Sequence, residues 1–354
     1  MSVAPSPPEL SLPVSVAPSP MVASRRRSPS AALLCIAWLW LLPVANALDD
    51  VRMVRTAWGV DEFERPEQWT QWMVGISELY QGVEVPTWVV CSGFPSYDGT
   101  CMHACNDTRA ALFAEALKTS GLFYVAQVHV CGVPIASAKV EDSIASLRAQ
   151  ATLAKELGAT MLNVHDGVDI WGDADVLRYF AAAVDIENSL GLVVAHETHR
   201  TRALATPRTT LLVLGAFPTV KLTADLSHWV IAAERAFDYP SDAAYWPPIL
   251  ERVANATVLT HARVGSAEAI QVNDPSAPEH AALVEAYERW WNVIWSRQAA
   301  LGRPVLIEPE FGPAPYLPTA PHTAMPLADL AKAVEYMSRR QLRRIERGEC
   351  AAPV

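Results

Sequence analysis

Apolar, β-branched runs recur along the chain from Val51 onward, and stretches with helical periodicity separate them. The runs are VRMVRTAW (51–58), VPTWVV (85–90), LFYVAQVHV (122–130), ATMLNVH (159–165), LVVAHE (192–197), TVKLTAD (219–225), TVLTHARV (257–264) and PVLIEPEF (304–311). Their starts lie roughly 30 to 50 residues apart, the length of a strand plus a crossover helix. This pattern predicts an α/β fold, specifically a (β/α)8 TIM barrel built as a single domain.

Helical stretches stand between these runs, most clearly at 142–157, 174–190, 277–301 and 327–347. The third is expected to begin with a capping box made by Ser276 and Glu279. Glycines fall between a helical stretch and the next run, where a helix commonly ends in a left-handed residue; these are Gly82, Gly121, Gly158, Gly191 and Gly302. A doubly wound open sheet is the alternative fold, but no glycine-rich fingerprint follows the first run to support it.

The first 47 residues differ from the rest of the chain. The basic cluster Arg25-Arg26-Arg27 precedes an apolar run (31–42), and small residues follow at Ala45 and Ala47. This order is typical of a cleaved signal peptide, so we expect a leader at 1–47 and a barrel domain at 48–354 in the secretory pathway. A retained signal anchor and an organelle transit peptide are the alternatives. Because a membrane span needs roughly 20 apolar residues, no stable span is expected after cleavage.

The composition and charge of the chain limit which classes of binding partner are expected. The chain has 354 residues, of which 51% are apolar and 19% charged, which is typical of a globular protein. Its net charge of -10 gives no electrostatic support for a nucleic-acid partner, so a small polar substrate is favoured. A homo-oligomer is compatible with this composition. Three cysteines crowd into the segment from Cys91 to Cys105, and one disulfide is expected there with its pairing left open.

Polar side chains end most of the predicted strands. They are His129, His165, Glu197, Asp225, His261 and Glu310. In a parallel barrel the carboxyl ends of the strands form the rim that carries the active site. The sequence therefore predicts that chemistry takes place at this rim.

Four of these residues come from consecutive strands and form an oxygen-rich donor set: Glu197, Asp225, His261 and Glu310. Such a set suits one Mn²⁺, Mg²⁺ or Co²⁺ ion, whereas zinc more often attracts thiolates or several imidazoles. Three buried carboxylates would repel one another, and a dication removes that repulsion. Each acid taken alone would more often be a solvated rim residue or an arginine partner. Glu308 shares a face with Glu310 and is the substitute ligand if the register differs.

The segments that hold these residues resemble the xylose isomerase-like TIM barrels. They are HETHR (196–200), LTADLSHW (222–229), THARVG (260–265) and PEFGP (309–313). That superfamily contains sugar isomerases, keto-sugar 3-epimerases, inosose-processing enzymes and endonuclease IV. HARVG followed by QVNDP, together with PEFGPAPYLPT, is similar to its sugar phosphate isomerase/epimerase branch. The resemblance covers most of the chain, from 51 to about 337.

The resemblance implies roles for particular residues. The four donors would bind one metal, Glu197 and Glu310 would also move the proton, and His228 of the D-x-x-H motif would contact substrate. Two positions depart from the epimerases, because Ala203 and Ala267 stand where those enzymes carry a glutamate and an arginine. The general chemistry is therefore expected to transfer while the identity of the substrate is not.

The sequence thus predicts a divalent-metal-dependent isomerase or epimerase that acts on a keto-sugar or polyol through an enediolate. Returning the abstracted proton to the opposite face epimerises, and returning it to the neighbouring carbon isomerises. The expected substrate-binding residues are His228, His165, Arg263, His129, Arg200 and Trp58. His196 should point away from Glu197 by strand alternation and serve structure.

Two other functions remain open. An endonuclease IV-like phosphodiesterase would use His129, His165 and His228 to hold further zinc ions, although no D-x-H pair follows His261. A non-catalytic, secreted carbohydrate-binding barrel would retain only a relict site. The intact pair Glu197 and Glu310 argues against that last alternative.

Overall fold

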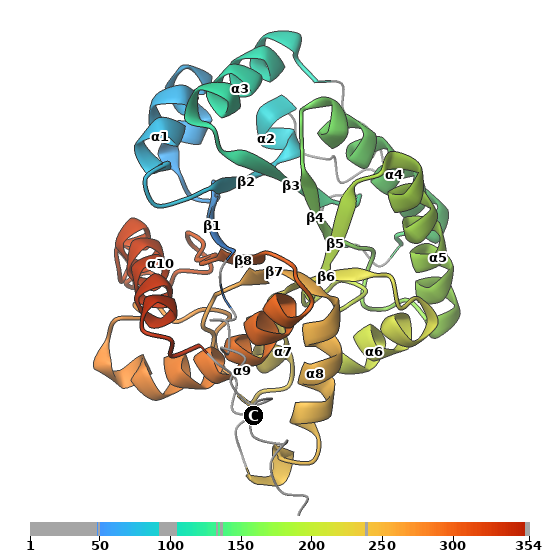
Figure 1. The fold of residues 1–354 in the computed structure, drawn as a ribbon, viewed down its shortest axis with the longest axis vertical. Helices are drawn as coiled ribbons and strands as arrows, with labels where there is room; N and C mark the ends of the chain where they lie inside the picture. The colour runs from blue at the N-terminus through green and yellow to red at the C-terminus, as the bar shows by residue number, and fades with distance from the viewer. Residues whose placement is uncertain are drawn as a thin grey trace, which may run out of the picture. The chain divides into compact units, whose positions relative to one another are not determined.

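The predicted barrel is confirmed. The structure is a computed structural model that describes residues 48, 50–91, 105–131, 134, 137–237 and 240–350, so the expected leader at 1–47 lies outside the described residues. Parallel strands form a closed barrel in chain order (Figure 1). They are β1 (Val51–Thr56), β2 (Gly82–Pro86), β3 (Phe123–His129), β4 (Met161–His165), β5 (Val193–Glu197), β6 (Lys221–Ala224), β7 (Thr257–His261) and β8 (Val305–Glu308). β1 pairs with both β2 and β8, which closes the ring.

Helices surround the strands as an outer layer (Figure 1). They are α1 (Trp69–Ile76), α2 (Thr87–Cys91), α3 (Asp107–Ser120), α4 (Val140–Glu156), α5 (Asp173–Leu190), α6 (Pro207–Ala216), α7 (Ser227–Ala232), α8 (Trp246–Ala256), α9 (Ala281–Ala300) and α10 (Leu330–Glu346). The four clearest helical stretches of the sequence correspond to α4, α5, α9 and α10. Within the described ranges, no helix is long and apolar enough to cross a membrane.

The barrel interior changes from apolar to polar along the strands. A small apolar cluster is separate from the main core and comprises Val54, Val125, Met161, Ala195 and Leu259. Because side chains alternate along a strand, positions two residues further on point to the same interior. All five of those positions are polar and buried, namely Thr56, Gln127, Asn163, Glu197 and His261. The fold therefore places an apolar layer below a polar layer at the carboxyl ends of the strands.

The second predicted strand exists, but its predicted bounds of 85–90 are wrong. β2 ends at Pro86, and the β-branched residues that follow form the short helix α2. Arg109 of α3 donates from Nε to the Val90 carbonyl at 3.1 Å and from Nη2 to the Val89 carbonyl at 2.6 Å. These bonds satisfy carbonyls at the end of a helical turn. Tertiary contacts thus override the local β preference of the sequence.

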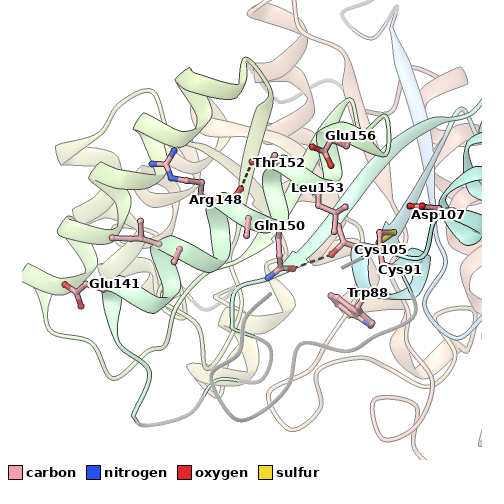
Figure 2. A pocket seen from close by; sticks show the side chains of 14 residues that line it. Trp88, Cys91, Cys105, Asp107, Glu141, Arg148, Gln150, Thr152, Leu153 and Glu156 are labelled. Atoms are coloured by element: carbon pink, nitrogen blue, oxygen red, sulfur yellow. Dashed lines mark hydrogen bonds between the residues drawn. A yellow bond between two sulfur atoms is a disulfide. The ribbon is translucent and has the colours of Figure 1, made fainter. Parts of the chain in front are cut away.

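A disulfide joins Cys91 to Cys105 and settles the pairing that the sequence left open, while Cys101 lies outside the described residues. It borders a pocket whose other described walls come mainly from α4, including Arg148 and Glu156 (Figure 2). Trp88 of α2 also borders this pocket and reaches the cavity at the barrel mouth. Four of the six predicted strand-end residues line the mouth cavity instead, namely His129, His165, Glu197 and Glu310.

Two predicted helix ends differ from the structure. Gly82 does not end a helix but lies inside β2, where a Cβ would come within 2.4 Å of the Phe123 ring. The other four glycines have positive φ as predicted, from Gly191 at 63° to Gly158 at 87°. The capping box is wrong because Ser276 donates its hydroxyl to Asp274 Oδ1 at 2.6 Å, and α9 begins later.

Candidate metal centre at the barrel mouth

The four predicted metal ligands converge at the carboxyl ends of β5 to β8. Glu197 and His261 end their strands, Asp225 directly follows β6, and Glu310 stands two residues beyond β8. Their relative exposures are 1%, 0%, 0% and 3% in the order Glu197, Asp225, His261 and Glu310. One ligand atom of each lies within 4.8 Å of the ligand atoms of the others. The fold therefore forms one compact donor set from residues far apart in sequence.

One carboxylate oxygen of Glu197 has hydrogen-bond partners in the described structure, and the other has none. Its Oε2 accepts from Asn163 Nδ2 at 2.7 Å and lies 2.7 Å from His165 Nε2. Its Oε1 is buried without a hydrogen-bond partner in the described structure. Burial alone would raise the pKa of Glu197, but His165 and His261 outweigh it and hold the pKa well below its usual range. An ionised, partly unsatisfied carboxylate is what a cation or a transferable proton requires.

Asp225 is fixed by its own turn and by an arginine. Its Oδ1 accepts from the Ser227 amide at 2.9 Å and from the Ser227 hydroxyl at 2.5 Å. Its Oδ2 accepts from Arg263 Nη2, which also lies 3.2 Å from Glu310 Oε2. Burial raises the pKa of Asp225, while Arg263 opposes that shift. Arg263 thus acts as counterion to two of the four donors.

His261 lies between two sets of carboxylates. Its Nδ1 is 3.1 Å from Glu310 Oε2 and 3.8 Å from Glu197 Oε2. Burial would lower the pKa of His261, but Glu310, Glu197 and Glu84 raise it well above its usual value. Burial would also raise the pKa of Glu310, but His261 and Arg263 hold it below its usual range. Without a metal, a protonated imidazole therefore partly balances the carboxylates.

This donor set fits a divalent cation. Three buried carboxylates surround one imidazole, and Arg263 supplies only one permanent positive charge. A dication would bring the charge of these carboxylates and the arginine to zero with His261 neutral. The buried oxygen Glu197 Oε1 has no hydrogen-bond partner among the residues that the structure describes, so it is available as a ligand. The residues present therefore match the oxygen-rich coordination that Mn²⁺, Mg²⁺ or Co²⁺ prefers.

Four imidazoles form a row beside this set. The ring centroids of His129 and His165 are 4.0 Å apart, those of His165 and His199 are 4.5 Å apart, and those of His199 and His228 are 3.7 Å apart. Burial holds the pKa values of His129, His199 and His228 well below the usual value, so these three rings are neutral near pH 7. Ligand atoms of His165, Glu197 and His199 form a second group with metal-binding geometry.

Of the remaining predicted substrate residues, Trp58 and Arg263 line a cavity of about 450 Å³ at the mouth, whereas Arg200 is not among its lining residues. Trp58 packs edge-on against Tyr316 with ring centroids 4.8 Å apart, and both line the cavity. The guanidinium of Arg263 lies 5.3 Å from the centre of the Tyr316 ring, as does that of Arg200. Arg200 therefore packs on an aromatic wall of the cavity, whereas Arg263 reaches the donor set below.

His196 occupies the structural position expected of it. Its Nδ1 lies 2.8 Å from Asp166 Oδ2, and both residues are buried on the side of β5 away from Glu197. Glu308 ends β8 one layer below Glu310 and joins Glu84 and His261 in a third group with metal-binding geometry. Burial raises the pKa of Glu308 well above its usual range. It therefore belongs to the layer beneath the four donors.

Sequence reasoning missed Glu84 and Gln127. Glu84 lies in β2, and the predicted second strand began one residue after it. A charged residue inside the apolar segment GVEVP was the available signal, because an interior carboxylate requires a buried partner. Gln127 lies within β3 and donates from Nε2 to Glu84 Oε1 at 2.9 Å. Both side chains support the mouth from the polar layer beneath it.

Comparison with known proteins agrees with this architecture. A sequence profile of xylose isomerase-like TIM barrels matches residues 77–298, and no curated protein sequence matches the chain. Among solved structures, a D-psicose 3-epimerase has a TM-score of 0.52 at 14% identity and covers 83% of this chain and 98% of its own. A D-allulose 3-epimerase from Methylomonas sp. has a TM-score of 0.51 at 12% identity, with coverages of 84% and 97%.

A xylose isomerase-like TIM barrel protein from Mycobacterium smegmatis, solved in complex with magnesium, has a TM-score of 0.50 at 14% identity and coverages of 83% and 98%. At these identities the structural likeness shows the fold alone. The profile match spans more than half of the chain and includes the first three predicted metal ligands, Glu197, Asp225 and His261. This chain therefore belongs to the family of xylose isomerase-like TIM barrels.

Proposed function

We propose that this protein is a divalent-metal-dependent isomerase or epimerase that acts on a keto-sugar or polyol through an enediolate intermediate. One observation carries the proposal: Glu197 and Glu310 are buried within one donor set with Asp225 and His261, at the base of the mouth cavity. Proton transfer next to a carbonyl needs a base close to a group that stabilises negative charge, and this arrangement provides both.

The roles of the side chains follow from their surroundings. A divalent cation held by the four donors would acidify the C–H bond next to the substrate carbonyl. Glu197 and Glu310 both have lowered pKa values, so each is ionised near pH 7 and accepts a proton. The C–H proton would pass to the ionised Glu197 carboxylate. The enediolate would then be reprotonated either on its other face by Glu310, which carries a proton taken from solvent while Glu197 releases its own to solvent, or at the neighbouring carbon by Glu197 itself. The first course epimerises and the second isomerises the substrate.

The cavity walls suit a sugar or polyol. Trp58 and Tyr316 offer apolar ring faces for the C–H side of a sugar. We assign hydroxyl binding to polar groups around them, namely His228, His165, Arg263, His129 and Arg200. The similar folds of the D-psicose and D-allulose 3-epimerases, and the magnesium in the M. smegmatis protein, support this assignment of substrate class and metal.

A phosphodiesterase is the second candidate function, and one observation favours it. Ligand atoms of His165, Glu197 and His199 form a group that adjoins the predicted metal site through Glu197. A second, softer ion such as Zn²⁺ held there would give two adjacent cations, an arrangement that cleaves phosphodiesters. Metal content separates the two functions, because the isomerase requires one exchangeable ion and the phosphodiesterase requires several zinc ions.

Solvent exchange tests the proposal most simply. The purified protein, loaded with Mn²⁺, is incubated in D₂O with a panel of keto-sugars and inososes, and deuterium at carbon is measured by mass spectrometry. We expect incorporation into at least one compound, with a loss of about 10²–10⁴-fold in E197Q and in E310Q. No incorporation across the panel, together with undiminished sugar binding, would instead indicate a carbohydrate-binding barrel.

We further propose that residues 1–47 direct the protein to the secretory pathway and are then removed. The disulfide between Cys91 and Cys105 supports an oxidising compartment. Amino-terminal sequencing of the protein recovered from the medium should begin at or near Leu48. Recovery of the intact chain only from the cytosolic or organelle fraction would contradict this assignment.

A further inference from the structure

A buried carboxylate that the proposed reaction does not use lies beneath the metal donors. Glu84 is 1% exposed and pairs in register with Thr56 across β1 and β2. Its Oε1 accepts from Gln127 Nε2 at 2.9 Å and from Asn163 Nδ2 at 3.4 Å. Its Oε2 lies 3.5 Å from His261 Nε2. Glu84 therefore contacts two amides through one oxygen and the imidazole through the other.

Both amides also reach the glutamates above. The Asn163 amide donates to Glu197 Oε2 at 2.7 Å, and the Gln127 amide lies 3.5 Å from Glu310 Oε1. A carboxamide carries two donor hydrogens, so each can bond Glu84 and one glutamate at the same time. Glu84 consequently contacts three of the four predicted ligands, directly or through one amide.

The imidazole contact has a chemical consequence. His261 Nδ1 faces the donor set, with Glu310 Oε2 at 3.1 Å, while Nε2 faces Glu84. An imidazole that binds a metal through Nδ1 carries its hydrogen on Nε2, and an acceptor there fixes the tautomer and the ring orientation. Glu308 Oε2 is also on the Nε2 side but farther away, at 3.8 Å. Glu84 is thus the nearer acceptor for that hydrogen.

We propose that Glu84 is a positioning residue for the metal centre. It holds the Nε2–H form of His261 so that Nδ1 faces the cation. Through the amides of Asn163 and Gln127 it also orients the two glutamates. The inference rests on the proposed metal-dependent function and adds a carboxylate from β2 to a site otherwise built from β5 to β8.

Metal affinity tests the role of Glu84. A glutamine has only one acceptor oxygen, so E84Q cannot serve both the amides and the imidazole. We expect its Mn²⁺ dissociation constant, measured by calorimetry, to rise by about 10–100-fold. Its thermal midpoint should not fall, because the substitution removes a buried charge. E84D keeps both oxygens and should recover much of the affinity.

A matched control separates positioning from general destabilisation. Glu288 of α9 is also buried and accepts two hydrogen bonds from Arg340, so E288Q changes a buried glutamate outside the barrel. E288Q should lower the thermal midpoint and leave Mn²⁺ affinity unchanged. In ¹⁵N-histidine spectra of the Mg²⁺-loaded protein, His261 should appear as the Nε2–H tautomer in the wild type. That signal should broaden or shift in E84Q.

The outcomes are distinguishable. If E84Q binds Mn²⁺ within about twofold of the wild type, or if E288Q loses as much affinity as E84Q, Glu84 is not a positioning residue, although the metal site stands. If the wild type binds no divalent ion, the proposed function fails together with this inference. Should E84Q not fold, Q127M removes the amide beneath Glu310 and should weaken Mn²⁺ binding by about 10-fold. Unchanged affinity in Q127M would then overturn the proposal.

Discussion

Replacing Arg263 by methionine tests how the mouth balances its buried charges. Arg263 is buried, and its Nη2 donates to Asp225 Oδ2 and lies 3.2 Å from Glu310 Oε2. Methionine fills much of the same volume but leaves two buried carboxylates without that cation. Removing one partner of a buried ion pair typically costs about 3–5 kcal/mol. At about 2–4 °C per kcal/mol, the metal-free R263M protein should melt about 6–20 °C below the wild type.

Mn²⁺ should then reduce the difference in melting temperature between R263M and the wild type. A ligand that binds only the folded state at 1,000 times its dissociation constant adds about 4 kcal/mol of stability. In R263M the cation also replaces the missing counterion of Asp225 and Glu310, so its stabilising effect should exceed that in the wild type. Thermal unfolding in EDTA and in Mn²⁺ measures how much the ion stabilises R263M and how much it stabilises the wild type.

A control variant keeps the experiment specific. Arg340 pairs with Glu288 on the outer helices, so R340M removes an arginine–glutamate pair far from the donor set. Mn²⁺ should not restore its stability beyond the gain in the wild type. If metal-free R263M melts within 1–2 °C of the wild type, or if Mn²⁺ stabilises R263M and R340M equally, the account of charge balance at the mouth is refuted.

Further predictions concern pH and the cavity wall. The raised pKa of His261 means that Mn²⁺ must displace a proton from the imidazole when it binds. The logarithm of the Mn²⁺ association constant should therefore rise by about one per pH unit below that pKa. Calorimetry in buffers of different ionisation enthalpy should detect the released proton, and binding heats that do not depend on the buffer would contradict this prediction. Glu197 has a lowered pKa in the folded state, so its ionisation stabilises the metal-free protein above about pH 4.3. This stabilisation is lost as the pH falls through the folded pKa. The free energy of unfolding of E197Q, measured with denaturant, should lack this loss in acid. A Cβ on Gly312 would lie 2.1 Å from the Trp58 ring, so G312A should displace the indole. The substitution should raise KM more than it lowers kcat. Unchanged steady-state kinetics would show that Trp58 does not shape the substrate site.

Part of this structure was readable from the sequence because the signal was periodic. Apolar runs separated by helical stretches indicated eight strands, and a polar residue at the end of a run indicated the rim. Glu197, Asp225 and His261 each combine both signals, which is why their convergence could be expected before the structure. Whether they bind a metal remains a prediction.

Other features depend on contacts that no local pattern reveals. The segment after Pro86 has β-branched composition, yet Arg109 binds its carbonyls in a helical turn. Glu84 lies in the strand whose limits were misplaced, so its inward direction could not be inferred. The contact between Arg263 and Asp225 joins residues 38 positions apart, just beyond the carboxyl ends of the neighbouring strands β7 and β6. Such pairings follow from barrel register rather than from sequence spacing.

Anomalous diffraction from a crystal grown with Mn²⁺ would test the central claim most directly. We predict one strong peak, about 2.0–2.4 Å from a ligand atom of each of Glu197, Asp225, His261 and Glu310. A D225N crystal should show a weaker peak or none at that position. A wild-type peak on the imidazole row at His165, or no peak at the mouth at all, would contradict the account.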